Sequence, residues 1–253
     1  MDLDPALAAL RPLGGFFVLR TAPGRADAAG GPDPGRLPTL AETYAGVARE
    51  GRRDALTERV ATVADRLGTP EPRVAASLAQ QGLAARLWSV ALGGAVLYGR
   101  SPDLDPRLLR WDPAAAVPDD LYLTELRPRP GDAATLAATV LRGHLEPLGE
   151  ALRARCGSAP GLLWGNAGSA LAGAARELDR WARAHGRGDA AGRARALTDE
   201  LFAHPLLRTT GTRTGTAFRR RSCCLYYRVP GGGVCGDCCF TRPPRSSPGA
   251  ASG

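Results

Sequence analysis

Most of the cysteines of this chain are gathered near its end, in a pattern that could bind metal. Five of the six lie within seventeen residues: Cys223, Cys224, Cys235, Cys238 and Cys239. Thiolates are soft ligands, and four of them together select zinc or iron–sulfur chemistry over hard cations. Residues 225–229 are predicted to form a short strand, and the Pro-Gly-Gly-Gly run at 230–233 is typical of a turn. Such a turn would fold the last cysteines back onto the first pair, so that four thiols converge.

The spacing of the cysteines helps to distinguish a zinc site from an iron–sulfur cluster. Zinc sites usually pair two Cys-x2–4-Cys knuckles, whereas Cys223 and Cys224 are adjacent and their side chains point to opposite faces in extended backbone. Both can reach one centre only if the backbone kinks there, and a cluster with two irons relaxes that demand. Iron–sulfur ligation is therefore favoured over structural zinc or simple oxidisable thiols. Cys239 makes the register ambiguous, but counting Cys-x2-Cys from Cys235 selects Cys238.

The pattern Cys-Cys-x10-Cys-x2-Cys resembles the C-terminal segment of the FhuF-type ferric-siderophore reductases, and Cys223, Cys224, Cys235 and Cys238 match it position by position. The resemblance also touches residues 164–171, with Trp164 and Asn166, and residues 87–89. It implies that the four cysteines hold a [2Fe–2S] cluster that reduces ferric siderophores by one electron and releases Fe(II). No nucleotide or flavin fingerprint is present, so we expect a separate electron-donor protein, ferredoxin-like or a flavin reductase.

The basic charge of the chain is concentrated in the same region. All 33 basic residues are arginine, against 25 acidic ones, and eight arginines but a single acid, Asp237, follow residue 207. GC-rich codon usage explains the general arginine excess. Arg219, Arg220 and Arg221 are either a solvated face or partners of an anionic cluster. The rival hypothesis is a zinc-stapled basic module that binds nucleic acid or an acidic protein. The main hypothesis, a ferric-siderophore reductase, includes no nucleic acid and at most peripheral contact with a membrane.

Neither the N-terminal residues nor the longest apolar run points to export. The acidic N-terminus lacks the apolar core of a signal peptide, and the longest apolar run, near residues 87–97, is short for a membrane span. Clustered cysteines in such a chain favour metal over disulfides, and we expect a cytoplasmic protein. Cys156 is expected to be a small core residue, and none of the three histidines has metal-ligand spacing.

The remaining chain predicts an α+β fold that is mainly α, a helical body with a few short strands and a small C-terminal cysteine hairpin. The expected division is a siderophore-binding body at 1–207, a [2Fe–2S] segment at 208–242 and a disordered tail at 243–253. Strands are predicted at 13–19 and 121–126, and a loop at 21–38. Helices are predicted to end at Gly68, to run over 74–97 in one broken or two consecutive pieces, and to cover 169–185 and 190–202. Asp132 is expected to cap a helix that Pro147 bends or interrupts. Asn166 or Ser169 caps the next helix, or the segment lies near substrate or cluster.

Overall fold

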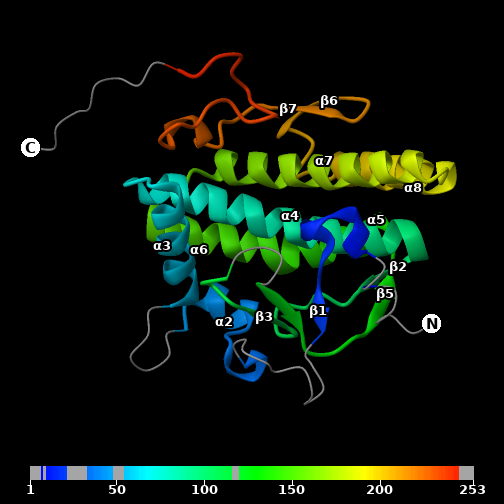
Figure 1. Ribbon diagram of the computed structural model, residues 1–253, viewed down its shortest axis with the longest axis horizontal. Helices are drawn as coiled ribbons and strands as arrows, with labels where there is room; N and C mark the ends of the chain where they lie inside the picture. Colours follow the sequence, from blue (N-terminus) through cyan, green and yellow to red (C-terminus); the bar gives the residue numbers. More distant parts are fainter. Residues whose placement is uncertain (1–6, 8–9, 22–32, 48–53, 116–119, 245–253) are drawn as a thin grey trace, which may run out of the picture.

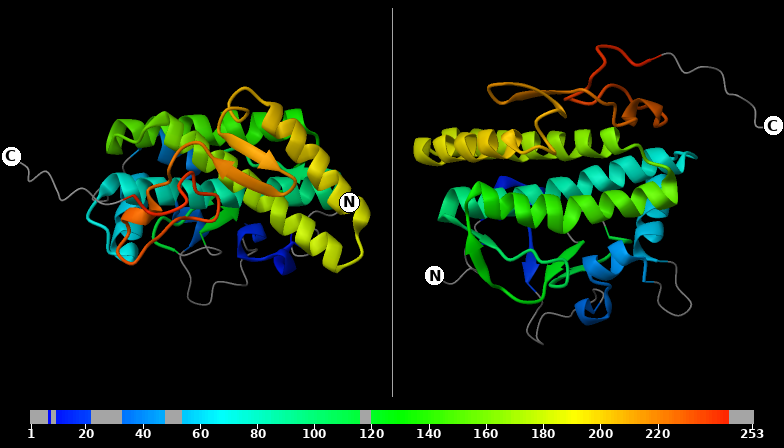
Figure 2. Two further views of the ribbon diagram at one scale, coloured as in Figure 1. Left: turned by 90° about the horizontal axis from the view of Figure 1, so that it is seen from above. Right: turned by 180° about the vertical axis from the view of Figure 1, so that it is seen from behind.

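Three layers make up the molecule, with helices in the middle, short β-ladders on one side and the cysteine segment on the other (Figure 1). The computed structural model describes residues 7, 10–21, 33–47, 54–115 and 120–244. Two further views show the same order of layers (Figure 2). The predicted fold class, mainly α with a few short strands, is confirmed.

The helical elements are η1 (Arg11–Leu13), η2 (Gly15–Phe17), η3 (Pro34–Arg36), α2 (Leu40–Ala45), α3 (Ala55–Leu67), α4 (Pro72–Tyr98), α5 (Ala133–Leu136), the π-helical η4 (Ala137–Leu145), α6 (Glu146–Cys156), α7 (Pro160–Ala184), α8 (Gly188–Ala203) and η5 (Tyr226–Arg228). The strands are β1 (Arg20–Thr21), β2 (Arg100–Pro102), β3 (Leu109–Trp111), β4 (Leu121–Leu123), β5 (Pro128–Pro130), β6 (Gly211–Thr214) and β7 (Ala217–Arg220).

The long helix α4 is the centre of the molecule. The sequence allowed either one broken helix or two consecutive helices, and the structure has one continuous helix. This helix packs most extensively against α7. Most of its residues are buried, including Trp88 with no exposed surface, so it shows no one-sided apolar stripe. Gly68 ends α3 as predicted, and Gly99 ends α4; both glycines have the left-handed conformation.

Of the two strands predicted before the cysteine segment, one is confirmed and one is wrong. β4 lies within the predicted 121–126 strand, between parallel β1 and antiparallel β3, and all three of its residues are buried. The predicted strand at 13–19 is wrong, because this segment folds as the 3-10 turns η1 and η2. Gly14, with φ of 119°, reverses the chain, and the buried Phe17 ring packs against Gly93 of α4 in place of a ladder.

The helix after Asp132 begins as predicted and changes form before Pro147. The Asp132 carboxylate accepts a hydrogen bond from Thr135 N at 2.8 Å. The π-helical η4 then gives way to α6 at Glu146, so the change of helix type falls directly before Pro147, whose missing N–H cannot continue the hydrogen bonds of the preceding turn. His144 in η4 is fully buried between Tyr44 Oη, 2.8 Å from Nδ1, and the Leu104 carbonyl, 2.5 Å from Nε2. Burial lowers the pKa of His144 to about 4.

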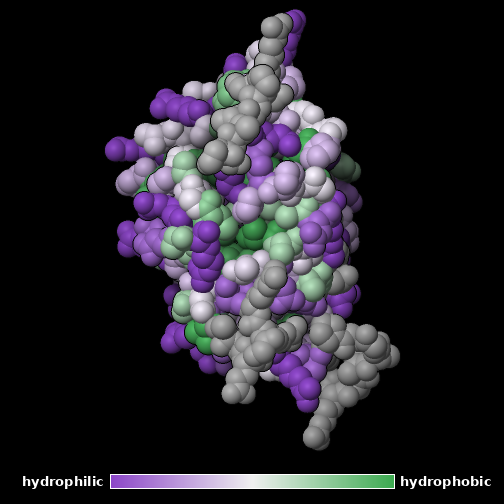
Figure 3. Space-filling model, turned by 90° about the vertical axis from the view of Figure 1, so that its left-hand side faces the viewer, coloured by the Kyte–Doolittle hydropathy of each residue, from purple (hydrophilic) through white to green (hydrophobic). Residues whose placement is uncertain are grey.

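The surface at the end of the molecule where α3 lies is mostly hydrophilic, with apolar residues gathered in a hollow near its middle (Figure 3). No helix in the described ranges combines the length and the apolar character that crossing a membrane requires. Most of the predicted loop at 21–38 and of the predicted disordered tail at 243–253 lies outside the described residues.

Candidate metal centre

The cysteine segment is carried by the hairpin β6–β7, which lies against α7. The hairpin was not predicted, and its register pairs Gly211 with Arg220 and Thr214 with Ala217. Two glycines of α7 allow the close approach. A β-carbon at Gly168 would overlap the Thr210 hydroxyl and press on the Phe218 ring, and one at Gly165 would collide with Ser222 Oγ. The hairpin and the start of the cysteine segment therefore rest directly on the backbone of α7.

The backbone turns sharply just after the vicinal cysteines. Leu225 has φ of 69°, the one positive φ of a non-glycine residue in the described part of the chain. The predicted strand at 225–229 is wrong, because the left-handed Leu225 starts the 3-10 turn η5 instead. The Leu225 N–H donates to Cys223 Sγ at 3.2 Å. This turn is a reversal of the kind that Cys223 and Cys224 need if both are to face one centre.

The five thiols lie near one another, and Cys224 and Cys235 form a hydrogen-bonded pair. The Cys235 thiol donates a hydrogen bond to the Cys224 sulfur, which lowers the pKa of Cys224 to about 7 and raises the pKa of Cys235. Burial raises the pKa of Cys223, with the nearby Cys238 and Cys239 adding to the effect. All five are free cysteines, and within the described ranges no three His, Cys, Asp or Glu side chains are grouped closely enough to hold one metal ion. Several thiols gathered in one region suit a centre with two metal ions, each needing two protein ligands.

A buried polar network lies directly behind the cysteines. Ser77 Oγ on α4 donates to the Cys224 carbonyl at 2.8 Å, and Asn166 Nδ2 on α7 donates to the Ser77 carbonyl at 2.9 Å. The Asn166 carbonyl oxygen accepts a short hydrogen bond from Arg220 Nη2. Each of the four residues is at most 2% exposed. Asn166 does not cap a helix, because α7 begins at Pro160; it connects both long helices to the cysteine segment.

Trp164, the other predicted member of this segment, faces elsewhere. It is half-buried and lines a separate small cavity between α6 and α7, together with Gln80 and Leu163. The structure therefore brings Asn166, but not Trp164, to the cysteines.

The three consecutive arginines separate into one buried and two exposed residues. Arg220 is 2% exposed, whereas Arg219 and Arg221 are exposed, as alternation along an extended strand dictates. No carboxylate lies within ion-pair distance of Arg220 among the described residues, and its contacts are the neutral oxygens of Asn166, Leu162 and Gln81. A buried cation without an anion is costly. Arg220 lies near enough to the cysteines to favour their thiolate forms, so an anionic cluster held by those thiolates fits this site.

Asp237 ties the Cys235–Cys238 turn to α7. One carboxylate oxygen accepts a hydrogen bond from Ser169 Oγ at 2.6 Å, and the other faces Arg176 Nη1 at 3.1 Å. Its carbonyl accepts the Arg220 N–H at 2.9 Å. Ser169 was also proposed as a helix cap, and it instead serves this contact inside α7.

Two members of these networks, Ser77 and Asp237, were not predicted. Asp237 carried a usable signal, since it is the single acid among the many arginines after residue 207. Ser77 carried none beyond being a polar residue within an apolar helix.

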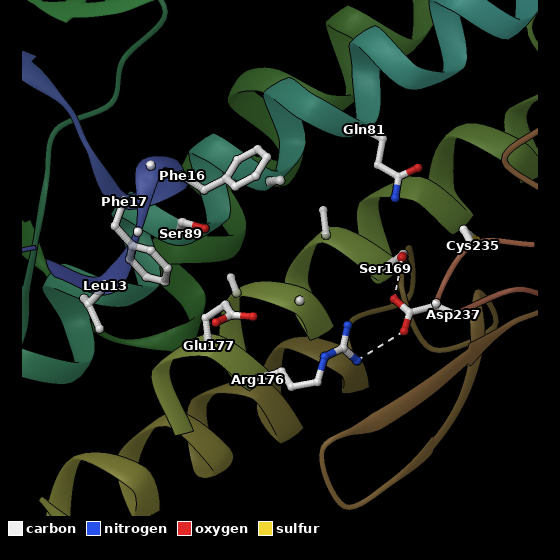
Figure 4. Close-up of a pocket in the computed structure, with 17 residues that line it drawn as sticks. Leu13, Phe16, Phe17, Gln81, Ser89, Ser169, Arg176, Glu177, Cys235 and Asp237 are labelled. Carbon is white, nitrogen blue, oxygen red and sulfur yellow. Dashed lines mark hydrogen bonds and ion pairs between the residues drawn. The ribbon is translucent and has the colours of Figure 1, made fainter. Parts of the chain in front are cut away.

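A cavity of about 430 Å³ opens beside the cysteine turn (Figure 4). Leu13, Phe16 and Phe17 line it on one side, and Gln81 and Ser89 line it from α4. Its remaining labelled wall consists of Ser169, Arg176 and Glu177 on α7 and of Cys235 and Asp237. An apolar floor with a few polar groups, in a volume of this order, is typical of small-molecule sites. Cys235 thus lies at the boundary between the thiols and a space that a ligand can enter.

Comparison with known proteins finds a family match for the cysteine segment. Residues 220–240 match the family model described as the FhuF 2Fe-2S C-terminal domain, which supports iron–sulfur over zinc. No curated protein matches the chain. The matched range contains Arg220, all five clustered cysteines and Asp237.

Proposed function

We propose that this protein, whose residues 220–240 match the FhuF 2Fe-2S C-terminal domain, is a one-electron reductase of ferric siderophores that releases Fe(II) in the cytoplasm. The observation that carries the proposal is the ligand-sized cavity bounded by Cys235. A bound [2Fe–2S] cluster supplies single electrons, which is the number that Fe(III) requires. Fe(III), the harder ion, binds siderophore oxygens tightly and Fe(II) binds them weakly, so reduction frees the metal.

The residues of the chain have distinct roles in this proposal. Cys223, Cys224, Cys235 and Cys238 hold the cofactor, and Arg220 supplies a fixed positive charge on its buried side. Asp237 holds the Cys235–Cys238 turn against α7, which keeps one wall of the cavity in place. The cavity orients the ferric complex beside Cys235 and limits the water between them.

The first test is the metal content and the reaction itself. Protein prepared anaerobically should contain about two irons and two sulfides per chain. After reduction with dithionite, its visible spectrum should return to the oxidised form when a ferric siderophore is added, and a ferrous chelator should trap Fe(II). Zinc without sulfide, or a reduced spectrum left unchanged by hydroxamate, catecholate and citrate complexes, would refute the reductase proposal.

The second test concerns the cavity. Ala85 lines it from α4 and is half-buried, so Ala85→Trp should fill much of the space and slow reoxidation by ferric siderophore about tenfold or more. Ala154→Trp, at an exposed position of α6 outside the cavity, is the matched control and should react like the parent protein. Equal rates for both variants would show that the substrate does not use this cavity.

A further inference from the structure

The cysteine segment also carries exposed apolar residues. Five large hydrophobic residues in the described ranges are exposed, and three belong to this segment: Tyr226 at 38%, Val234 at 40% and Phe240 at 39%. Each is close to a cysteine. Val234 precedes Cys235 directly, and the Phe240 N–H lies 3.4 Å from Cys238 Sγ.

Contacts connect this apolar surface to Cys239 and to basic residues. Arg219 Nη2 donates to the Cys239 carbonyl at 3.1 Å, and the Phe240 ring makes an edge contact with Tyr227 at a centroid distance of 6.2 Å. Arg242 follows two residues later and is exposed. We call Arg219, Tyr227, Cys239, Phe240 and Arg242 the outer cysteine face. None of these residues lines the cavity, whose nearest cysteine is Cys235.

The free charge around this face is entirely positive. Arg219, Arg221 and Arg242 are exposed, and no carboxylate within the described residues forms an ion pair with any of them. Two other arginines of the region are paired, Arg213 with Asp199 and Arg228 with Glu71. The one acid of residues 208–244, Asp237, is buried and paired with Arg176. Exposed cations beside exposed aromatic rings can therefore attract an acidic partner and pack against it.

We propose that the outer cysteine face is the docking site of an acidic one-electron carrier protein, so that electrons enter on this face and leave through the cavity. The proposal rests on the reductase function. In the entry step the carrier loses one electron and this protein gains it, and no bond is made or broken. The following step passes that electron to Fe(III) in the cavity, so each carrier molecule accounts for one Fe(II).

The composition of the face favours a protein over a nucleic acid. Three free arginines could contact few phosphates, whereas stable duplex binding commonly uses about six to ten such contacts. The contact of Arg219 with the Cys239 carbonyl also places the partner beside the redox site, which nucleic acid would not need. A small basic and apolar patch is typical of weak, transient encounters between redox proteins.

The test uses the full chain with its cluster and a reduced plant-type ferredoxin as the acidic probe. Stopped-flow absorbance gives the second-order rate constant for electron transfer at increasing NaCl. The rate for the parent protein should fall steeply with salt. Neutralising Arg219, Arg221 and Arg242 to Gln should lower the low-salt rate about tenfold or more and flatten its dependence on salt.

The matched control removes three exposed arginines from the helical body and its β-ladders. Arg129→Gln, Arg142→Gln and Arg153→Gln lower the net charge by the same amount and should retain nearly the parent rate and salt slope. Equal slowing of both triple variants, or a rate insensitive to salt, would overturn the docking proposal. So would salt-dependent binding of a 20-base-pair DNA duplex that the first triple variant loses while its ferredoxin rate stays at the parent value. Reoxidation of the dithionite-reduced parent by ferric siderophore is measured separately, and its absence would refute the reductase function instead.

Discussion

Replacing Arg220 with methionine should have different effects on the protein with and without its cluster. Without the cluster, this guanidinium is a buried cation with no carboxylate partner among the described residues. Burying an ion costs several kcal/mol, and the hydrogen bond to Asn166 returns about 1.5–3 kcal/mol of that. Arg220→Met should therefore change the free energy of unfolding of the metal-free protein by less than about 1 kcal/mol, or increase it.

With the cluster bound, the same change removes a compensating charge. For a charge roughly 8 Å away at an effective dielectric constant of about 20, each unit charge interacts by about 2 kcal/mol. An oxidised cluster with four thiolates carries about two negative charges, so the variant should lose about 4 kcal/mol of cluster-dependent stability. Reduction adds one more negative charge. In the variant, the free energy of reducing the cluster should become less favourable by about 2 kcal/mol, which lowers the one-electron potential by roughly 90 mV.

Two assays and two controls decide the matter. Denaturation of the metal-free and cluster-loaded forms measures the stabilities, and anaerobic redox titration followed by visible absorbance measures the potential. Arg220→Lys keeps a positive charge and should retain most of the potential, while Arg221→Met removes an exposed charge that solvent screens and should shift it much less. An unchanged potential in Arg220→Met, or equal destabilisation of both forms, would refute the argument that Arg220 is the counter-charge.

Three further predictions concern the ligand register, the docking of the hairpin and acid stability. Cys238→Ser should lose the cluster or shift its visible spectrum strongly, whereas Cys239→Ser should retain iron content and spectrum; the opposite result would move the register by one residue. Gly168→Ala should lower the free energy of unfolding by about 1–3 kcal/mol because its β-carbon meets Thr210 and Phe218, while Gly173→Ala, with open space around it, should gain up to about 1 kcal/mol. Urea denaturation of both should show this difference, and equal effects would contradict the tight contact. His144 has a pKa of about 4 in the folded protein against 6.5 when unfolded, so its contribution to stability is complete above pH 6.5 and is lost as the pH falls toward 4. The loss should reach about 3 kcal/mol, and His144→Gln should show a correspondingly flatter pH dependence in urea denaturation; an unaltered slope would contradict the neutral buried imidazole.

The parts of the fold that depend on local chemistry could be predicted from the sequence. Gly68 at the C-terminal end of α3 and Asp132 at the start of α5 act on their immediate neighbours, and these helix limits are confirmed. The two wrong strands, at 13–19 and 225–229, are short apolar runs whose conformation depends on where their side chains pack. In the first, Phe17 fills a space beside α4, and that space is invisible in the local sequence.

The candidate site shows the same limit. The cysteine spacing identified the cofactor, because a metal centre imposes its own short pattern on the chain. The network from Ser77 through Asn166 to Arg220 joins residues 89 and 54 positions apart, and no local pattern relates them. Strand alternation alone would have separated Arg220 from Arg219 and Arg221, had the hairpin been recognised.

The glycines of α7 bear on the order in which parts of the protein fold during synthesis. The cysteine segment contributes little core of its own, and its foundation is the surface of α4 and α7, which the Gly165 and Gly168 contacts keep within reach. During synthesis both helices leave the ribosome before residue 208, so the surface that shapes the cysteine segment can be complete when the thiols emerge. The assembly machinery that delivers iron and sulfide would then meet a site already arranged by the body of the protein. Metal loading would in that case report on correct folding of the helices as much as on the supply of iron.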